Sequence, residues 1–230
     1  MKYVACLPFK VKEFRDEFVK TCKFDNLLEV DNTENNIGIM ASYNLGVQKM
    51  YAEDADWLIA MSAAIRFGEP GGLDVLEYLS DTKYKIVEGA ELYGWHLIAF
   101  HRSVIDLVGE WDTNFTPYGY DDIDLSIRIQ KTFKNSHPGD NGSFLWTKQK
   151  FDISDTIMAH SIKIGGLTSS PQHEEALRQY FEAKWGLPPG QGSVDDVYDY
   201  PFNDSSNSIK YFPKNENEKY HISNFEKMAN

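Results

Sequence analysis

Short apolar runs alternate with segments of helical character along the first third of this chain. This alternation restricts the possible folds more than any other feature of the sequence. The apolar runs are Tyr3–Phe9, Leu27–Val30 and Trp57–Met61, and the segments between them, residues 11–22 and 40–52, are expected to be helices. Strands that alternate with helices in this order are typical of a parallel, Rossmann-like sheet. The sequence therefore predicts an α/β fold with a central, mostly parallel sheet flanked by helices.

A parallel sheet also indicates where a ligand would bind. Ligands of such sheets lie beyond the carboxyl ends of the strands. The loops after Phe9, Val30 and Met61 are therefore expected to carry a nucleotide site. The other expected elements are a helix at 73–79, strands at 97–100 and 156–159, a loop at 135–143, and a helix at 172–185 between Pro171 and Gly186.

The composition supports one folded domain followed by a polar tail. Hydrophobic residues make up 42% of the 230 residues, as in globular chains. Residues from 201 onward are rich in Asn, Asp, Ser and Lys, so we expect a domain over 1–200 and a tail over 201–230 that wraps it or is partly disordered. The net charge of −12 disfavours a nucleic-acid partner, because phosphate binding needs clustered Lys and Arg.

The cysteines and the hydropathy pattern predict a cytoplasmic protein. Cys6 and Cys22 show no metal-ligand spacing and are expected to be reduced thiols. The longest apolar run, Trp57–Ile65, is too short to span a bilayer. The first residues lack the apolar stretch and cleavage site of a signal peptide. The oligomeric state is left open.

A pair of carboxylates marks the candidate catalytic centre. Asp121 and Asp122 follow a loop that contains Gly119 and open an amphipathic segment. A carboxylate at such a junction can be buried on one side and open to substrate on the other, which suits a general base. The alternative is structural, since acidic residues at a helix N-terminus interact favourably with the helix dipole.

This acidic motif resembles that of inverting GT-A glycosyltransferases of the family 2 type, in which Glu-Asp or Asp-Asp precedes an apolar residue, Asp and Leu. Other segments, in matching order over residues 1–190, resemble the same family. These segments are Val30–Thr33, Asn36–Gly38, Asn44–Gly46 and Tyr180–Gly186.

The resemblance implies a single GT-A domain that transfers a sugar, with inversion, from a nucleoside diphosphate sugar to an acceptor hydroxyl. It places Asp122 as the general base, with Asp121 beside it. The acceptor could be a glycan, a protein or a modified nucleobase. The nucleotide-binding candidates are Asp31, Asn32, Asn36, Ser62 and Arg66, the candidates for the sugar or acceptor are Gly94 and Trp95, and those for the metal or diphosphate are His160 and Lys163.

Several of these residues also fit a structural role. Asp31 could cap the turn that follows it, Trp95 could belong to the core, and a lone His such as His160 is often structural.

The secondary structure of residues 122–133 is ambiguous, because their apolar side chains alternate as in a strand, whereas the resemblance favours a helix. On that helix Asp124 is expected at the surface or in support of the cap.

One departure from the family concerns the divalent cation, Mn²⁺ or Mg²⁺. The family ends its third strand with a short acidic motif that holds the ion, and here Ser62, Ala63 and Ala64 occupy those positions. Alanine offers no side-chain ligand to a hard cation. Other groups such as His160 could hold the ion, cations such as Arg66 or Lys163 could replace it, or the chain could be an inactive or altered relative.

Two other classes of function stay open. A non-catalytic sugar- or nucleotide-binding relative would account for the lost acidic motif. A nucleotidyltransferase could share the architecture, but it would normally carry a Gly-rich, Arg-containing loop after its first strand, and Leu7–Lys10 lacks one.

Overall fold

The computed structural model describes residues 1–89, 95–116, 119–134, 145–155 and 170–211. Its centre is a six-stranded sheet in the order β2-β1-β3-β6-β5-β7. β1 is parallel to β2 and to β3, and β7 is parallel to β5, whereas β6 runs antiparallel to both of its neighbours. The strands are β1 (Tyr3–Phe9), β2 (Leu27–Asp31), β3 (Trp57–Met61), β5 (Ile86–Gly89), β6 (Leu97–His101) and β7 (Trp146–Gln149).

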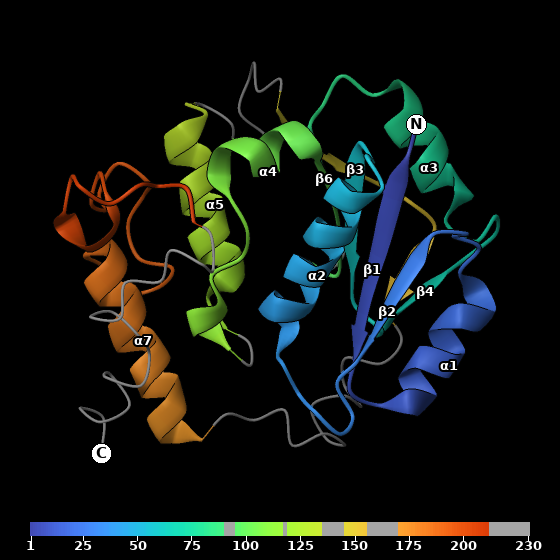
Figure 1. The fold of residues 1–230 in the computed structure, drawn as a ribbon, viewed down its shortest axis with the longest axis horizontal. Coiled ribbons are helices and arrows are strands. Elements are labelled where there is room, and N and C mark those ends of the chain that lie inside the picture. Colours follow the sequence, from blue (N-terminus) through green and yellow to red (C-terminus); the bar gives the residue numbers. More distant parts are fainter. Residues whose placement is uncertain (90–94, 117–118, 135–144, 156–169, 212–230) are drawn as a thin grey trace.

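Helices cover both faces of this sheet (Figure 1). α1 and α3 pack on one face, and α2, α4, α5 and α7 contribute to the core on the other. A two-stranded ribbon, β4 with β8, lies beside the sheet. The helices are α1 (Lys12–Thr21), α2 (Ile39–Ala52), α3 (Leu73–Asp81), α4 (Arg102–Val108), α5 (Asp121–Thr132) and α7 (Pro171–Trp185), and the ribbon strands are β4 (Ile65–Phe67) and β8 (Ile153–Asp155).

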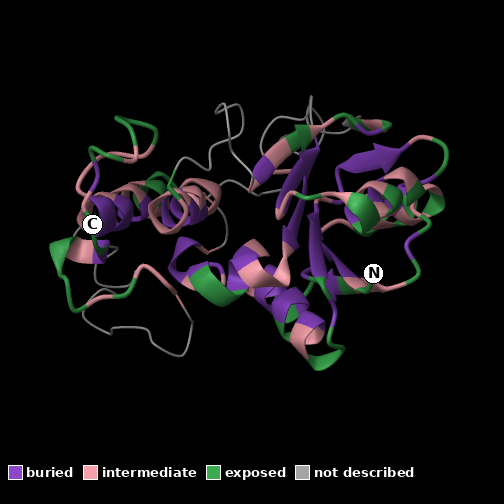
Figure 2. Ribbon diagram, turned by 90° about the horizontal axis from the view of Figure 1, so that it is seen from above, coloured by how far each residue is buried: buried purple, intermediate pink, exposed green. Residues whose placement is uncertain are grey.

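The alternation of side chains along a strand explains the two-sided core. In β1, Val4 and Cys6 belong to the cluster under α2, whereas Ala5 and Leu7 belong to the cluster under α1. All four are fully buried. Successive side chains of a strand point to opposite faces, so a strand covered on both sides is apolar throughout. Figure 2 shows the central strands in the colour of buried residues.

The predicted α/β class is confirmed, and the segment 122–133 is a helix, α5. Its alternating Leu125, Ile127 and Ile129 are all buried, because a helix packed between α4 and α7 has a broad buried face. β4, β5, β7, β8 and α4 were not expected from the sequence. The expected strand at 156–159 and the expected loop at 135–143 lie outside the described residues.

The start of the expected tail packs against the domain. Pro201 is buried, and the ring of Phe202 lies 5.8 Å from that of Tyr180 on α7. Tyr211 forms a β-bridge with Gly109, where a Cβ atom would lie 1.9 Å from the Tyr211 carbonyl oxygen. Glycine is therefore needed at position 109 for this approach. The boundary at residue 201 stays a prediction. Among the described helices, none combines the length and apolarity needed to cross a membrane.

Candidate active site

The loops that follow β1, β2 and β3 meet at one edge of the sheet. Phe9 at the end of β1 pairs with Asp31 at the end of β2, and the Asn32 amide donates to the Phe9 carbonyl oxygen at 2.8 Å. β6 runs in the opposite direction, so it begins at this edge. There the Ser62 amide donates to the His96 carbonyl oxygen at 2.9 Å. The sheet thus brings Asp31, Ser62 and the start of β6 to the same edge.

The acidic pair opens α5 directly after a left-handed turn. Tyr120 has φ 62° and ψ 1°, a conformation that non-glycine residues rarely adopt outside functional or tightly held turns. Its ring packs at 5.9 Å from that of Phe181 on α7. Asp121 accepts a hydrogen bond from the Gly119 amide at 3.2 Å, and Asp122 accepts one from the Ile123 amide at 2.8 Å. Both carboxylates are half-buried.

Both carboxyl groups hold protons more strongly than exposed aspartates do. Burial, and next the charge of Asp122, raise the pKa of Asp121 to about 7. Burial also raises the pKa of Asp122. A carboxyl group that titrates close to neutral pH can accept a proton during a reaction and release it afterwards. Asp121 therefore has the acid–base properties expected of a catalytic carboxyl group.

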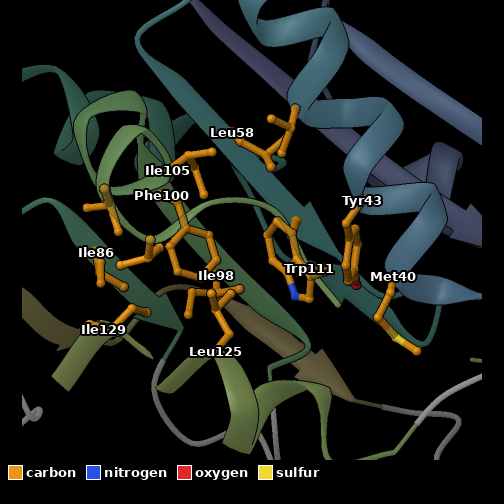
Figure 3. Packing of buried hydrophobic residues seen from close by; sticks show 14 of the residues in the cluster. Met40, Tyr43, Leu58, Ile86, Ile98, Phe100, Ile105, Trp111, Leu125 and Ile129 are labelled. Carbon is orange, nitrogen blue, oxygen red and sulfur yellow. The ribbon is translucent and has the colours of Figure 1, made fainter. Parts of the chain in front are cut away.

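Tyr43 of α2 connects this pair to the end of β3. Its hydroxyl donates to the Met61 carbonyl oxygen at 3.3 Å. Burial raises the pKa of Tyr43 well above its ordinary value, and the nearby Cys6 and Asp121 raise it further. Asp121 is therefore close enough to Tyr43 to act on it electrostatically, and Tyr43 touches the last residue of β3. Figure 3 shows Tyr43 beside Trp111, whose ring centroid lies 5.2 Å away.

Asp124 does not lie at the surface, and that expectation is wrong. Its side chain is fully buried, and it accepts hydrogen bonds from Arg128 Nε and Trp185 Nε1, each at 2.9 Å. Residues four apart on a helix share a face, so Asp124 and Arg128 both point into the core between α5 and α7. Lys184 Nζ lies 2.6 Å from the same carboxylate.

Lys184 also holds a second buried carboxylate, that of Asp112. The Lys184 Nζ to Asp112 Oδ2 distance is 2.7 Å, and the Tyr180 hydroxyl donates to the same oxygen at 2.7 Å. Burial alone would raise the pKa of Asp112, but the charge and hydrogen bond of Lys184 outweigh it, so the pKa is lowered. We call Asp112, Asp124, Arg128 and Lys184 the buried charge network. It fixes the first turns of α5 against α7.

The three candidates after β2 differ in exposure. Asp31 and Asn36 are exposed, whereas Asn32 is buried. Asn32 uses both ends of its amide inside the loop, since Nδ2 donates to Ser42 Oγ and Oδ1 accepts from the Ile37 amide, each at 3.0 Å. Asn32 thus braces the loop.

The two exposed side chains also make local hydrogen bonds. Asp31 Oδ1 accepts from the Thr33 amide at 2.8 Å and from the Thr33 hydroxyl at 2.6 Å. These bonds lower the pKa of Asp31. Asn36 Oδ1 accepts from the Gly38 amide at 3.0 Å. Both residues therefore shape turns at the edge of the sheet while their side chains stay accessible.

The Ser62–Ala64 turn stands where the acidic motif was expected. Ser62 Oγ accepts from the Ala64 amide at 3.2 Å, and the side chains of Ala63 and Ala64 are buried. The next side chain, Arg66, is 9% exposed and folds back on this turn, where Nη1 donates to the Ala63 carbonyl oxygen at 2.8 Å. The described part of the chain holds no group of three His, Cys, Asp or Glu side chains placed to bind a metal. The residues at this turn therefore do not fit a divalent ion.

Trp95 lies at the same edge, directly before β6. It is half-buried, and its ring contacts those of Phe100 and Trp146 edge-on, each at 5.8 Å between centroids. The contacts position the ring against the core and leave part of it accessible. Gly94, His160 and Lys163 lie outside the described residues.

Sequence reasoning missed Tyr43 and the buried charge network. Nothing local distinguishes Tyr43 from any other helix residue, since its contact with Met61 depends on how α2 crosses β3. The network did leave one trace in the sequence, namely the spacing of four between Asp124 and Arg128. Lys184, in the Tyr180–Gly186 segment that resembles the family, is buried at 3% exposure.

Comparisons with known proteins agree with this architecture. No protein-family model and no curated protein sequence matches the chain. The catalytic domain of Drosophila β1,4-galactosyltransferase 7, solved with xylobiose, matches 86% of this chain and 84% of its own with a TM-score of 0.51 at 15% identity. A mutant of that enzyme with manganese, UDP-Gal and xylobiose matches 86% and 85% of the chains with a TM-score of 0.51 at 12% identity.

A mannosyltransferase from Pyrobaculum calidifontis, in complex with GDP-Man and Mn²⁺, is more distant. It has a TM-score of 0.41 at 13% identity, and the match spans 56% of this chain and only 52% of the mannosyltransferase. The chain thus spans about half the length of that protein. Taken with the mixed six-stranded sheet and its flanking helices, the similarity to the galactosyltransferase shows that this chain has a GT-A fold.

Proposed function

We propose that this protein is an inverting glycosyltransferase, similar to family 2, that moves a sugar from a nucleoside diphosphate sugar to an acceptor hydroxyl. The observation that carries the proposal is the half-buried Asp121–Asp122 pair, with raised pKa values, in the first turn of α5 in a GT-A fold. The galactosyltransferase with this fold was solved with UDP-Gal and xylobiose, which supports the same classes of donor and acceptor here.

In the proposed reaction, Asp122 accepts the proton of the acceptor hydroxyl. The acceptor oxygen forms a bond to the anomeric carbon of the sugar from one face. The bond from that carbon to the diphosphate oxygen breaks on the opposite face, and its electron pair leaves with the nucleoside diphosphate. General-base assistance of this kind contributes about 10²–10⁴-fold to the rate. Asp121, which shares the site, keeps a proton close to neutral pH and so limits the repulsion between the two carboxylates.

The donor is proposed to lie over the loops after β1, β2 and β3. Asp31 and Asn36 are accessible there for the base or ribose, and Asn32 supports their loop. Trp95 would face the sugar or acceptor from the start of β6, and Gly94, the preceding residue in the sequence, is proposed for the same ligand. Ser62 and Arg66 are proposed as further nucleotide contacts, and His160 and Lys163 are proposed for the metal or the diphosphate. The cytoplasmic location is also part of the proposal, since Cys6 and Cys22 are both free thiols.

A screen of nucleoside diphosphate sugars tests the function. One or more donors should raise the melting temperature, and the same donors should be hydrolysed or transferred. A non-catalytic binding protein, which the Ser62–Ala64 turn favours, would show the thermal shift without turnover. Absence of binding by every donor, with and without Mn²⁺, would contradict both functions.

Replacing Ala64 by Asp should strengthen Mn²⁺ binding by about tenfold or more. Ala64 stands where the family holds its ion, and a carboxylate there would supply the oxygen ligand that is missing. Calorimetry with Mn²⁺ in the presence of a nucleoside diphosphate measures the change. Ala52→Asp is the matched control, because it adds the same charge at the exposed end of α2.

The unmodified chain should bind Mn²⁺ weakly in that experiment. Tight binding in the micromolar range, about −8 kcal/mol, that is unchanged in His160→Ala would contradict the placement of the acidic motif at Ser62–Ala64. The metal site would then lie elsewhere in the chain.

A further inference from the structure

We propose that the guanidinium group of Arg66 binds the diphosphate of the donor. It would supply the positive charge that a divalent cation supplies in the family whose acidic motif holds the ion. The inference rests on the proposed function, which it deepens by assigning the countercharge for the leaving group. It concerns one site, the Ser62–Ala64 turn with Arg66, and one ligand chemistry, a pyrophosphate group.

The first argument is position. Arg66 lies on β4, which begins directly after the turn that follows β3. Its Nη1 donates to the carbonyl oxygens of Ala63 at 2.8 Å and Ile65 at 2.6 Å. The guanidinium group is therefore held at the turn where the family places its metal-binding carboxylates. The same turn directly follows Met61, whose carbonyl oxygen accepts a hydrogen bond from the Tyr43 hydroxyl.

The second argument is an unused donor. Arg66 Nη2 is buried and has no hydrogen-bond partner. Buried polar groups in proteins are nearly always paired, so an exception calls for a physical reason. Both donations to backbone carbonyls come from Nη1 and hold the guanidinium group in place, so Nη2 remains a donor without an acceptor. A preorganised Arg donor of this kind suits phosphate oxygens.

The third argument is charge. Among the described residues no carboxylate forms an ion pair with Arg66, and Glu17 of α1 acts on it only as a more distant charge. Burial lowers the pKa of Arg66, and the charge of Glu17 offsets only part of this effect. A bound diphosphate would provide that partner. A divalent cation at the same turn would instead be repelled by the fixed guanidinium.

A metal site and an arginine site at this turn therefore predict different conditions for diphosphate binding. A metal site without carboxylates would bind a diphosphate only together with Mn²⁺ or Mg²⁺. An arginine site binds it without any metal, and the binding weakens when salt screens the charges. Inorganic pyrophosphate is the simplest probe, because it carries the diphosphate and none of the nucleoside or sugar contacts.

The experiment is calorimetric titration of the full chain with inorganic pyrophosphate in EDTA. The unmodified protein should bind, and Arg66→Gln should weaken binding by about tenfold or more. The control is Arg102→Gln, which removes the same charge at the other edge of the sheet, where the Arg102 amide bonds to Asp56 just before β3. That control should bind like the unmodified protein.

A second variant guards against misfolding. Arg66→Gln loses bonds to two carbonyls, so its folding is checked by circular dichroism and thermal melting. Arg66→Lys keeps the charge and one such bond but loses the planar pair of donors, and it should bind pyrophosphate more weakly than the unmodified protein even if Arg66→Gln does not fold.

Equal binding by Arg66→Lys, Arg66→Gln and Arg102→Gln would overturn the inference, as would binding that requires Mn²⁺. Donor turnover, measured on the same proteins, separates this inference from the function. If donor turnover persists and pyrophosphate binding is unchanged by substitution of Arg66, the glycosyltransferase function is supported and only the arginine site is contradicted. Pyrophosphate binding that depends on Arg66 in a chain that turns over no donor would support the anion site and contradict the transferase.

Discussion

Replacing Asp122 by Asn should leave donor binding nearly unchanged and lower turnover by about 10²-fold or more. The amide has the size of the carboxyl group and can still accept the hydrogen bond from the Ile123 amide, so the start of α5 should keep its shape. It cannot take a proton from the acceptor hydroxyl. Calorimetry with the donor and single-turnover assays separate the two effects.

Asp121→Asn is the matched control, because it changes the adjacent carboxyl group in the same way. It should lower turnover less than Asp122→Asn does. It should also raise stability above neutral pH. The pKa of Asp121 is raised from its ordinary 3.8 to about 7 in the folded chain, so its ionisation destabilises the fold progressively as the pH rises through that window. At pH 4 the stabilising effect of Asp121→Asn should be largely absent.

Near-normal turnover in Asp122→Asn would contradict its role as the base. A loss in Asp121→Asn that equals or exceeds that of Asp122→Asn would assign the base to Asp121 instead. The raised pKa of Asp121 makes this comparison informative, because a base whose pKa is close to the working pH is effective in proton transfer.

The α/β class followed from the sequence because β1 and β3 are buried on both faces and are apolar throughout. The direction of β6 could not be predicted in the same way. It is antiparallel to β3 and β5, and strand direction depends on pairing between distant segments. β4 and β8 are each three residues long, too short to show a period. The helix α5 was ambiguous because its buried face is wide enough to include alternating positions.

The candidate site likewise combines features that a local sequence pattern indicates with features that depend on distant segments. Asp121 and Asp122 became candidates because they lie in a local pattern, a glycine turn followed by an amphipathic segment. The partner that links them to β3, Tyr43, depends on the crossing of α2 over the sheet and has no local pattern. The folding back of Arg66 on Ala63 likewise depends on the turn geometry. Sequence patterns thus identified the candidate groups, and the tertiary fold determines what those groups touch.

The buried charge network provides the second large effect. Replacing Lys184 by Met should lower the free energy of unfolding by about 3–5 kcal/mol at neutral pH. Lys184 is 3% exposed and lies within 2.7 Å of carboxylate oxygens of both Asp112 and Asp124. Met fills a similar volume, so packing is largely kept, but Asp112 loses the cation that lowers its pKa. Urea denaturation followed by tryptophan fluorescence measures the change.

The pH dependence of the stability deficit in Lys184→Met identifies the cause of that deficit. In the unmodified protein the lowered pKa of Asp112 stabilises the fold above the ordinary carboxyl pKa, and this contribution is lost as the pH falls. Without Lys184 the pKa of Asp112 should rise instead, because burial is then unopposed. The deficit of Lys184→Met should therefore be largest at neutral pH and shrink towards pH 4. A simple packing defect would give a deficit that does not change with pH.

Two further variants complete this test. Lys20→Met, which removes an exposed lysine paired with Glu17 on α1, should have no measurable effect, because exposed ion pairs contribute little. Adding Asp112→Asn to Lys184→Met should recover part of the lost stability, since it removes the unpaired buried charge. A deficit of Lys184→Met below about 1 kcal/mol would contradict the network as the element that holds α5 against α7. The acidic pair would then have to be positioned by the Tyr120 turn and its contact with Phe181.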